Sequence, residues 1–380
     1  MIYLDHAATT PIPRDVADAM YEVLTEQYGN PSSQYAFGAD MKRRVEAWRQ
    51  TVADALGCPA KNLHFTSCGT ESDNWAISAA CWQNRHLGKH IVTTAVEHSA
   101  VRESCRWMEK QGYEVTFIQP DGNGNITAQQ VLDAVREDTA LVSVMLVNNE
   151  LGTVYPIAEI AAGLKKKNPA TLLHTDAVQA FLKIPFSART LGADFIAISG
   201  HKVGAPKGIG ALYISDRVRN VKPLLAGGGQ ESGLRAGTEA TAQIAGFARA
   251  VEVRMERSET FEETVSRMAR LKAYAKEQLA SIADVQFIGS GEAPHILALS
   301  LVGWPSQNIV NDLGSQGICI SAGSACHQGR PSHVIATLKL PKKVAGGVIR
   351  ISFGPDTTKA EIDAFVSALK THHDTRMPML

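Results

Sequence analysis

Short apolar runs alternate with longer stretches of helical spacing between about residues 62 and 215. Residues 99–111 and 127–136 are two of the stretches with helical spacing. Because strands that alternate with helices are typical of crossover connections, the pattern predicts a mostly parallel sheet buried between helices. The apolar runs expected to form its strands are residues 62–67, 90–95, 114–118, 141–147, 171–174, 194–199 and 211–214.

After residue 233 the pattern changes to a long charged segment followed by shorter elements. Residues 239–282 are compatible with helix, apart from a weak interruption near residues 258–260. A helix with Thr357 or Thr358 as its N-cap is expected to close the chain. Between them the sequence predicts strands at 285–288, 296–302 and 348–353 and a helix at 306–313. This mixture predicts a smaller α+β domain.

The composition is typical of a globular protein and bears on the number of domains and on possible partners. The chain has 380 residues, of which 44% are hydrophobic and 20% charged, as expected for a globular protein with a real core. A prior of about 150 residues per domain predicts two or three domains, or one large and one small. Because 38 basic residues balance 38 acidic ones, the charge gives no sign of direct binding to nucleic acid or to an anionic membrane.

The start of the chain and its cysteines indicate a cytoplasmic protein. The first ten residues contain Asp5 and lack the basic and apolar regions of a signal peptide. The longest apolar run, residues 141–147, is much shorter than the about 20 residues of a membrane helix. The six cysteines are too sparse for a disulfide scaffold and show no CxxC spacing, so we expect reduced thiols.

Lys202 follows a predicted buried strand, at the edge where parallel sheets bind ligands. A lysine there can form a Schiff base with a cofactor aldehyde if desolvation keeps part of it neutral. A solvated lysine that simply follows a strand is the alternative. Three glycines and a proline in residues 203–210 favour the first interpretation, because such a segment suits backbone that passes close to a ligand.

Asp176 and Gln179 follow another apolar run. Pyridoxal phosphate works as an electron sink when its ring nitrogen is protonated, and a carboxylate such as that of Asp176 keeps it so. Gln179 could hydrogen-bond the ring hydroxyl. A helix N-cap is the alternative role for Asp176.

Two further strand ends carry candidates for cofactor binding. Residues 62–72 predict a strand, a turn at Gly69 and a helix start, where free N–H groups and the Thr70 hydroxyl suit a phosphate. A capping box from Thr70 to Asp73 explains the same residues. His98 could stack on a planar cofactor and move protons, or be a hydrogen-bonded structural histidine.

Asn149 and Arg350 are candidates for substrate contacts. Asn149 follows an apolar run and could donate to cofactor or substrate, and turn chemistry is its alternative explanation. Arg350 lies within the apolar run 348–353, and its guanidinium fork suits a substrate carboxylate. A structural ion pair is the alternative.

Cys326 lies among small residues, with Gly323, Gly329 and Pro331 around it. This composition predicts a mobile loop. A cysteine there is either reactive or incidental, because reactivity requires a lowered pKa. Cys319, in the preceding strand-like run, is expected in the core.

Together and in this order, these segments resemble the cysteine desulfurases of the class V aminotransferase-like family. The resemblance covers nearly the whole chain, and so many motifs in register are highly specific. The shared motifs are YLDHAATTP at 3–11, GNPSS at 29–33, FTS-x-x-TES at 65–72, EHSAV at 97–101, VNNELG at 147–152, HTDAVQ at 174–179, SGHK-x-x-APKGIGALY at 199–213, GGGQE-x-GLRAGT at 227–238 and GSAC at 323–326.

The resemblance implies an α/β fold, the type I fold of pyridoxal-phosphate-dependent transferases. A large domain with a mostly parallel seven-stranded sheet between helices would span residues 15–255. The smaller α+β domain would contain residues 1–14 and 256–380, with a cysteine loop at about 323–334. By resemblance Thr238 would reach the phosphate in the neighbouring subunit, which implies a homodimer with shared active sites.

The resemblance also implies the roles of the site residues. The Schiff-base lysine falls on Lys202, the ring-nitrogen aspartate on Asp176, the glutamine on Gln179 and the stacking histidine on His98. Arg350 would hold the substrate carboxylate, and the persulfide cysteine would be Cys326. The remaining phosphate contacts would fall on Thr70, Ser199 and His201.

The implied reaction is the removal of sulfur from L-cysteine with pyridoxal phosphate, giving L-alanine and a persulfide on Cys326. Lys202 would remove the Cα proton, and the cysteine loop would carry the sulfur to an acceptor protein. The GSAC motif resembles the subgroup with a longer cysteine loop, which serves iron–sulfur cluster assembly or tRNA thiolation.

The chain departs from the family pattern at a few positions. It has Cys68-Gly69-Thr70-Glu71-Ser72-Asp73 where Gly-Ala-Thr-Glu-Ser-Asn is usual, Tyr35 in place of a histidine and Ser232 in place of an arginine. Two other functions compete: a pyridoxal-phosphate enzyme of the same fold, such as an aminotransferase or a selenocysteine-preferring lyase, and a non-catalytic sulfur-relay or scaffold protein. The first is tested by Cys326→Ala and the second by the colour of bound cofactor.

Overall fold

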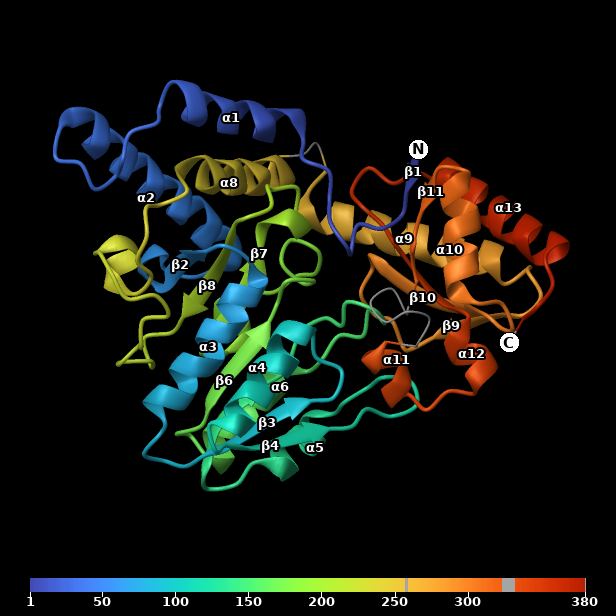
Figure 1. Ribbon diagram of the computed structural model, residues 1–380, viewed down its shortest axis with the longest axis horizontal. Helices are drawn as coiled ribbons and strands as arrows, with labels where there is room; N and C mark the ends of the chain where they lie inside the picture. The colour runs from blue at the N-terminus through green and yellow to red at the C-terminus, as the bar shows by residue number, and fades with distance from the viewer. Residues whose placement is uncertain (257–258, 323–331, 380) are drawn as a thin grey trace.

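The computed structural model describes residues 1–256, 259–322 and 332–379. Two groups of strands with their helices lie side by side, and the amino-terminal segment crosses from the smaller group to the larger (Figure 1). The larger group contains the central sheet, and the smaller contains an antiparallel sheet and the carboxyl-terminal helix.

The central sheet has seven strands within the described ranges, in the order β2-β8-β7-β6-β5-β3-β4. Strand β8 is antiparallel to both of its neighbours, and the other adjacent strands are parallel. The predicted mostly parallel seven-stranded sheet is therefore confirmed. Its strands are β2 (Leu63–Thr66), β3 (His90–Thr94), β4 (Glu114–Ile118), β5 (Thr139–Ser143), β6 (Leu172–Asp176), β7 (Phe195–Ser199) and β8 (Gly210–Ile214).

Each predicted apolar run contributes one strand to this sheet, with small differences at most boundaries. The exception is the run 141–147, because β5 already ends at Ser143. The following residues 144–147 stay buried, and the N–H groups of Val144 and Leu146 donate to carbonyls of β6. Burial alone keeps this segment apolar, so hydrophobicity could not indicate where the strand ends.

Helices cover both faces of the central sheet (Figure 1). Along the strands, successive side chains point to opposite faces, as the two-residue period of a strand requires. Ile91 and Phe195 pack with side chains of the helices α3 and α4, whereas Val92 and Ile196 pack with side chains of α2, α6 and α8. The helices of this group are α1 (Arg14–Thr25), α2 (Ala36–Leu56), α3 (Gly69–Gln83), α4 (Ser99–Lys110), α5 (Ala128–Ala134), α6 (Ile157–Lys167), α7 (Ala188–Leu191) and α8 (Thr241–Met255).

The smaller group contains an antiparallel sheet in the order β12-β13-β10-β9 and a parallel pair of β1 with β11. Its strands are β1 (Ile2–Tyr3), β9 (Val285–Ile288), β10 (Ile296–Leu301), β11 (Ile318–Cys319), β12 (Ser321–Ala322) and β13 (Val348–Ser352). Its helices are α9 (Phe261–Leu279), α10 (Ser306–Ser315), α11 (His333–Thr337), α12 (Lys342–Gly346) and α13 (Lys359–Thr375).

After residue 233, the structure has a helix or a strand wherever the sequence predicted that element. The long helical segment 239–282 forms two helices, α8, which ends at Met255, and α9, which begins at Phe261. Thr358, not Thr357, is the N-cap of α13, and its side chain forms a capping box with Glu361. Cys319, expected in the core, is only partly buried in β11.

In the described ranges, no helix combines the length and hydrophobicity that a membrane crossing requires.

Candidate functional site

A cavity of about 310 Å³ lies where the loops after β2, β3, β5, β6 and β7 meet. These strands are parallel to one another, so their carboxyl ends lie at one edge of the sheet. Apart from Thr238, every predicted site residue in the described part of the chain lines this cavity. These residues are Gly69, Thr70, His98, Asn149, Asp176, Gln179, Ser199, His201, Lys202 and Arg350.

Lys202 ends the short 3-10 helix η2 (Gly200–Lys202), directly after β7. Its Nζ donates hydrogen bonds to the carbonyl oxygens of Ala7 at 2.7 Å and Ala8 at 2.6 Å. Burial, followed by repulsion from Arg350, lowers the pKa of Lys202 to about 8. The amine is therefore partly neutral near neutral pH, and the alternative of a solvated lysine is wrong.

Asp176 ends β6 and is 5% exposed. Its Oδ1 accepts a hydrogen bond from the Val178 N–H at 2.9 Å, within a turn and not at the start of a helix, so the N-cap alternative is wrong. Burial raises the pKa of Asp176, and His98, the Val178 N–H and Lys202 oppose that rise. Gln179 donates from Nε2 to the Ala7 carbonyl at 2.8 Å and accepts from Lys183 Nζ at 3.0 Å.

The amino terminus of α3 supplies unpaired donors to the cavity. The helix begins at Gly69, and among the described contacts its N-cap, Cys68, makes no side-chain capping hydrogen bond. The first N–H groups of a helix have no partner within it, and the helix dipole favours an anion there. The proposed capping box from Thr70 to Asp73 is wrong, because both residues lie inside the helix.

Ser199 and His201 also line the cavity, and Ser199 lies beside the start of α3, since a Cβ on Gly69 would lie 3.6 Å from the Ser199 Cβ. The Ser199 Oγ is buried and has no hydrogen-bond partner in the described structure. His201 Nδ1 lies 3.2 Å from Thr9 Oγ1. Burial, followed by the positive charge of Lys202, lowers the pKa of His201 to about 4, so the ring is neutral at neutral pH. An unpaired hydroxyl beside an uncapped helix terminus fits a phosphate group.

His98 is the N-cap of α4, and its Nδ1 accepts a hydrogen bond from the Ala100 N–H at 3.2 Å. This contact fits the structural alternative for His98. The same imidazole also lines the cavity, so the capping bond fixes the ring at the site.

Arg350 reaches the cavity from β13 of the smaller sheet. It donates to Asp5 Oδ1 at 2.8 Å and to the Asn149 carbonyl at 2.7 Å, so the structural ion pair exists. Its Nε and the Asn149 Oδ1 are buried without hydrogen-bond partners in the part of the chain described. Arg350 therefore keeps a free donor, and Asn149 a free acceptor, for a polar ligand.

The structure corrects the role predicted for the glycines of residues 203–210, and it shows further residues that line the cavity. The glycines of residues 203–210 do not line the cavity; a Cβ on Gly210 would lie 2.9 Å from the backbone of Cys68, so this glycine serves strand packing. The cavity lining that the sequence did not indicate comprises Ala7, Ala8, Cys68, Asp73, Met145 and Val178. The helical spacing from Gly69 to Asp73 was the one available signal for Asp73.

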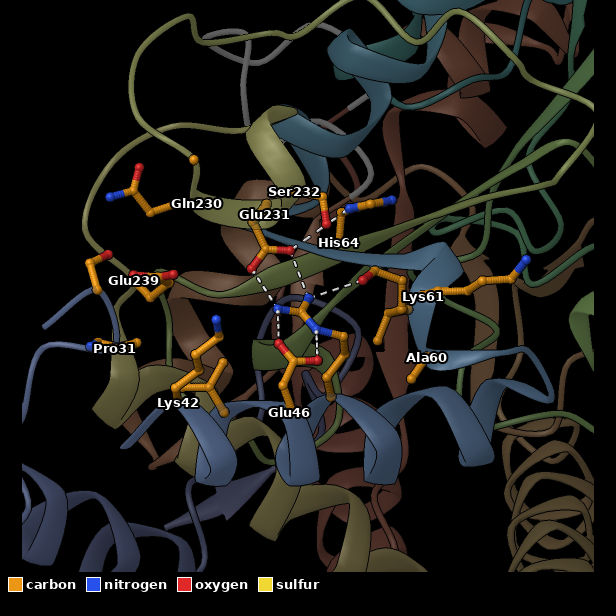
Figure 2. Close-up of a pocket in the computed structure, with 15 residues that line it drawn as sticks. Pro31, Lys42, Glu46, Ala60, Lys61, His64, Gln230, Glu231, Ser232 and Glu239 are labelled. Atoms are coloured by element: carbon orange, nitrogen blue, oxygen red, sulfur yellow. Dashed lines mark hydrogen bonds and ion pairs between the residues drawn. The ribbon is translucent and has the colours of Figure 1, made fainter. Parts of the chain in front are cut away.

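Thr238 is exposed and does not line the cavity of its own chain. It follows the 3-10 helix η3 (Gln230–Gly233), in which Glu231 and Ser232 have positive φ values of 49° and 60°. Arg49 holds this segment through hydrogen bonds of 2.7 and 3.0 Å to the Glu231 carboxylate. Figure 2 shows the carboxylates of Glu231 and Glu46 on opposite sides of the guanidinium that binds both, that of Arg49, in a second pocket of about 530 Å³. Cys326 lies outside the described residues.

Comparison with known proteins finds relatives along nearly the whole chain. Residues 2–365 match the family described as aminotransferase class-V. A cysteine desulfurase of Trichormus azollae is 41% identical over 97% of this chain and 92% of its own length. The cysteine desulfurase IscS of Methanosarcina thermophila is 38% identical over 95% and 89%.

A solved structure of a NifS-like protein superimposes with a TM-score of 0.91 at 34% identity, covering 97% of this chain and 98% of the other. The family match, the relatives and the superposition all extend over nearly the full length of the chain. The chain therefore belongs to the class-V aminotransferase family and, within it, to the cysteine desulfurases.

Proposed function

We propose that this chain removes the sulfur of L-cysteine in the 310 Å³ cavity, releases L-alanine and keeps the sulfur on Cys326 as a persulfide. One observation carries the proposal: a partly neutral lysine amine, a buried carboxylate and an uncapped helix terminus line a single cavity. Pyridoxal phosphate is the cofactor that this family uses, and these three groups match its aldehyde, its ring nitrogen and its phosphate.

The chain's own residues would hold this cofactor at both ends. The Ser199 hydroxyl, the Thr70 hydroxyl and the first N–H groups of α3 would bind the phosphate, with Gly69 at the turn and His201 beside them. Asp176 would hold a proton on the ring nitrogen, since a buried carboxylate stabilises a cation beside it. Once bound, the cofactor stabilises negative charge that develops on the substrate Cα.

Other residues would contact the ring and the substrate. His98 would stack on the ring, and Gln179 would turn its amide toward the ring hydroxyl. Arg350 would bind the substrate carboxylate through its unpaired Nε–H, with Asn149 beside it.

Lys202 would carry the cofactor on Nζ and, after the substrate displaces it, accept the Cα proton at the same atom. A lysine whose pKa is about 8 is a base of useful strength near neutral pH. The Cys326 thiolate would then form an S–S bond to the substrate sulfur while the substrate Cβ–S bond breaks. The electron pair of that bond stays on carbon, which is protonated as alanine leaves.

Two chains would share their sites in a homodimer. Thr238 is exposed and lies outside its own cavity, which is what a contact to the partner's phosphate requires. The buried Arg49–Glu231 pair holds the preceding residues in a conformation that non-glycine residues seldom adopt, so this loop would be fixed before the partner binds.

The persulfide sulfur would pass to an acceptor protein for iron–sulfur cluster assembly, tRNA thiolation or both, in the cytoplasm. Relatives of this chain carry the name IscS. The balanced charge of the sequence, with 38 basic and 38 acidic residues, supports a protein acceptor over direct contact with nucleic acid.

The test is release of alanine and sulfide from L-cysteine in the presence of a reductant. We expect equal amounts from the wild type and neither from Cys326→Ala or Lys202→Ala. Cys58→Ala is the matched control, because burial raises the pKa of the Cys58 thiol to about 12 and it lies outside the cavity. Cys68→Ala tests the one described thiol that lines the cavity.

Each outcome has a distinct meaning. Sulfide release that persists in Cys326→Ala and stops in Cys68→Ala would transfer the acceptor role to Cys68. A wild type that binds the cofactor, turns yellow and leaves L-cysteine intact would favour another substrate, such as that of an aminotransferase or a selenocysteine-preferring lyase. A colourless wild type would favour a non-catalytic sulfur-relay protein.

A further inference from the structure

Asp73 is a buried acid in the cofactor cavity for which the proposed function provides no role. It lies one turn into α3, is 1% exposed and lines the cavity. One oxygen of Asp73, one oxygen of Asp176 and one ring nitrogen of His98 lie within 4.8 Å of one another. The cavity lining thus contains two carboxyl groups close together.

The other neighbour of Asp73 is a buried histidine. Asp73 Oδ1 lies 3.4 Å from His174 Nε2, and neither atom has a hydrogen-bond partner among the described residues. On the other side of the ring, His174 Nδ1 lies 2.8 Å from Ser143 Oγ. His174 is fully buried, and burial lowers its pKa to about 3, so the ring carries a single N–H at neutral pH.

Two carboxylates at this separation, both out of water, are unfavourable together, and one of them keeps its proton. Asp176 has the Val178 N–H as a donor and lies near Lys202 and His98, which favour its ionised form. Asp73 has no such donor among the described residues, and besides Asp176 the nearby Glu97 and Cys68 disfavour its ionisation further. Burial and the charge of Asp176 raise the pKa of Asp73 well above its usual range.

We propose that Asp73 is a positioning residue of the cofactor site, a neutral acid that donates its proton to His174 Nε2 in a hydrogen bond. His174 then donates from Nδ1 to Ser143 Oγ. Asp176 is left as the only ionised carboxylate among the described residues of the cavity, so a single negative charge faces the ring nitrogen. This inference rests on the proposed function, because it takes Asp176 as the partner of that nitrogen.

Infrared spectroscopy of the cofactor-free protein at neutral pH tests the protonation without any activity. We expect a protonated-carboxyl C=O band in the wild type, part of which disappears in Asp73→Asn. Glu97→Gln identifies the band of a second buried acid, since burial raises the pKa of Glu97 to about 8. Asp133→Asn, an exposed aspartate on α5, is the matched control and should remove no such band. An Asp73→Asn spectrum that retains the full wild-type band would overturn the proposal.

The positioning role is tested by cofactor affinity and by the pH dependence of the bound cofactor's absorbance. Asp73→Leu leaves His174 Nε2 without its donor, and we expect cofactor affinity to fall on the order of tenfold. Asp73→Asn restores a donor and should recover most of that affinity, with the same pH midpoint as the wild type. If Asp73 were ionised, Asp73→Asn would remove a charge close to Asp176 and shift the midpoint by on the order of one pH unit, contradicting the proposal.

Failure of this inference differs from failure of the proposed function. If Asp176→Asn leaves the absorbance and its pH midpoint as in the wild type, the ring-nitrogen role of Asp176 is wrong. The infrared experiment still tests whether Asp73 is protonated, because it uses protein without cofactor.

Discussion

At the scale of single residues, the environment of each side chain sets its chemistry. The same amine that is a solvated cation on most surfaces is partly neutral at Lys202, because burial and Arg350 disfavour its charge. The carbonyls of Ala7 and Ala8 accept hydrogen bonds from its Nζ and fix its position. The lysine is thus both oriented and poised to react with an aldehyde.

The rate at which the cofactor-free protein captures pyridoxal phosphate should rise with pH. Only the neutral amine attacks an aldehyde, and a pKa of about 8 leaves roughly one tenth of Lys202 neutral at pH 7, so the rate should rise about tenfold and level off above the pKa. Rapid-mixing absorbance measures it. Lys202→Arg, which keeps its proton, should show no capture at any of these pH values. A rate that is flat with pH would show that the amine is already neutral.

At the scale of secondary-structure elements, packing against other elements determines where the start of α3 lies and which backbone conformation the segment around η3 adopts. The uncapped start of α3 faces the carboxyl edge of the sheet, where β6 and β7 place Asp176 and Ser199. The η3 segment keeps two left-handed non-glycine residues because Arg49 of α2 and the Phe65 N–H of β2 both bind Glu231. Contacts between elements therefore determine the local backbone.

Removal of either partner of the Arg49–Glu231 pair should strongly destabilise the protein. The two side chains are 9% and 3% exposed, so Glu231→Gln leaves a buried guanidinium with only the exposed Glu46 carboxylate, at 3.3 Å, as its counter-charge. We expect Glu231→Gln or Arg49→Met to lower the free energy of unfolding by about 3–5 kcal/mol, measured by urea denaturation. The double variant should cost less than the sum of the two.

The matched control is Arg43→Met on the same helix. Arg43 is 75% exposed and pairs with Asp40, so its loss should cost about 0–1 kcal/mol. Equal effects of Arg43→Met and Arg49→Met would mean that burial adds nothing to the Arg49–Glu231 pair.

At the scale of the whole molecule, the site exists only where the two groups of strands meet. The amino-terminal segment pairs with β11 through β1. Further along this segment, Asp5 accepts a hydrogen bond from Arg350, and the carbonyls of Ala7 and Ala8 accept hydrogen bonds from Lys202. Arg350 comes from the smaller sheet and Lys202 from the end of the central one. A ligand that fills this cavity contacts both groups and should stabilise them together.

Bound cofactor should therefore raise the stability of the entire chain. At a free cofactor concentration of about 100 times its Kd, we expect the free energy of unfolding to rise by about 2.7 kcal/mol. Thermal or urea unfolding at increasing cofactor concentration measures this shift. Lys202→Ala should need a much higher concentration for the same shift, whereas Lys207→Ala, an exposed lysine five residues further on, should behave as the wild type. A shift that is equal in both variants would place the cofactor elsewhere.

The sequence by itself determined the strands of the central sheet, the helices between them and the residues at the strand ends. These are linear features: buried strands must be apolar, and ligand-facing residues follow them directly. It could not determine that the Ala7 carbonyl binds Lys202, 195 positions away, that Asp5 pairs with Arg350, or that Asp73 lies beside Asp176 and His174. Only the tertiary structure decided these contacts, because burial and partner distance, which set charge and reactivity, depend on packing between segments far apart in the chain.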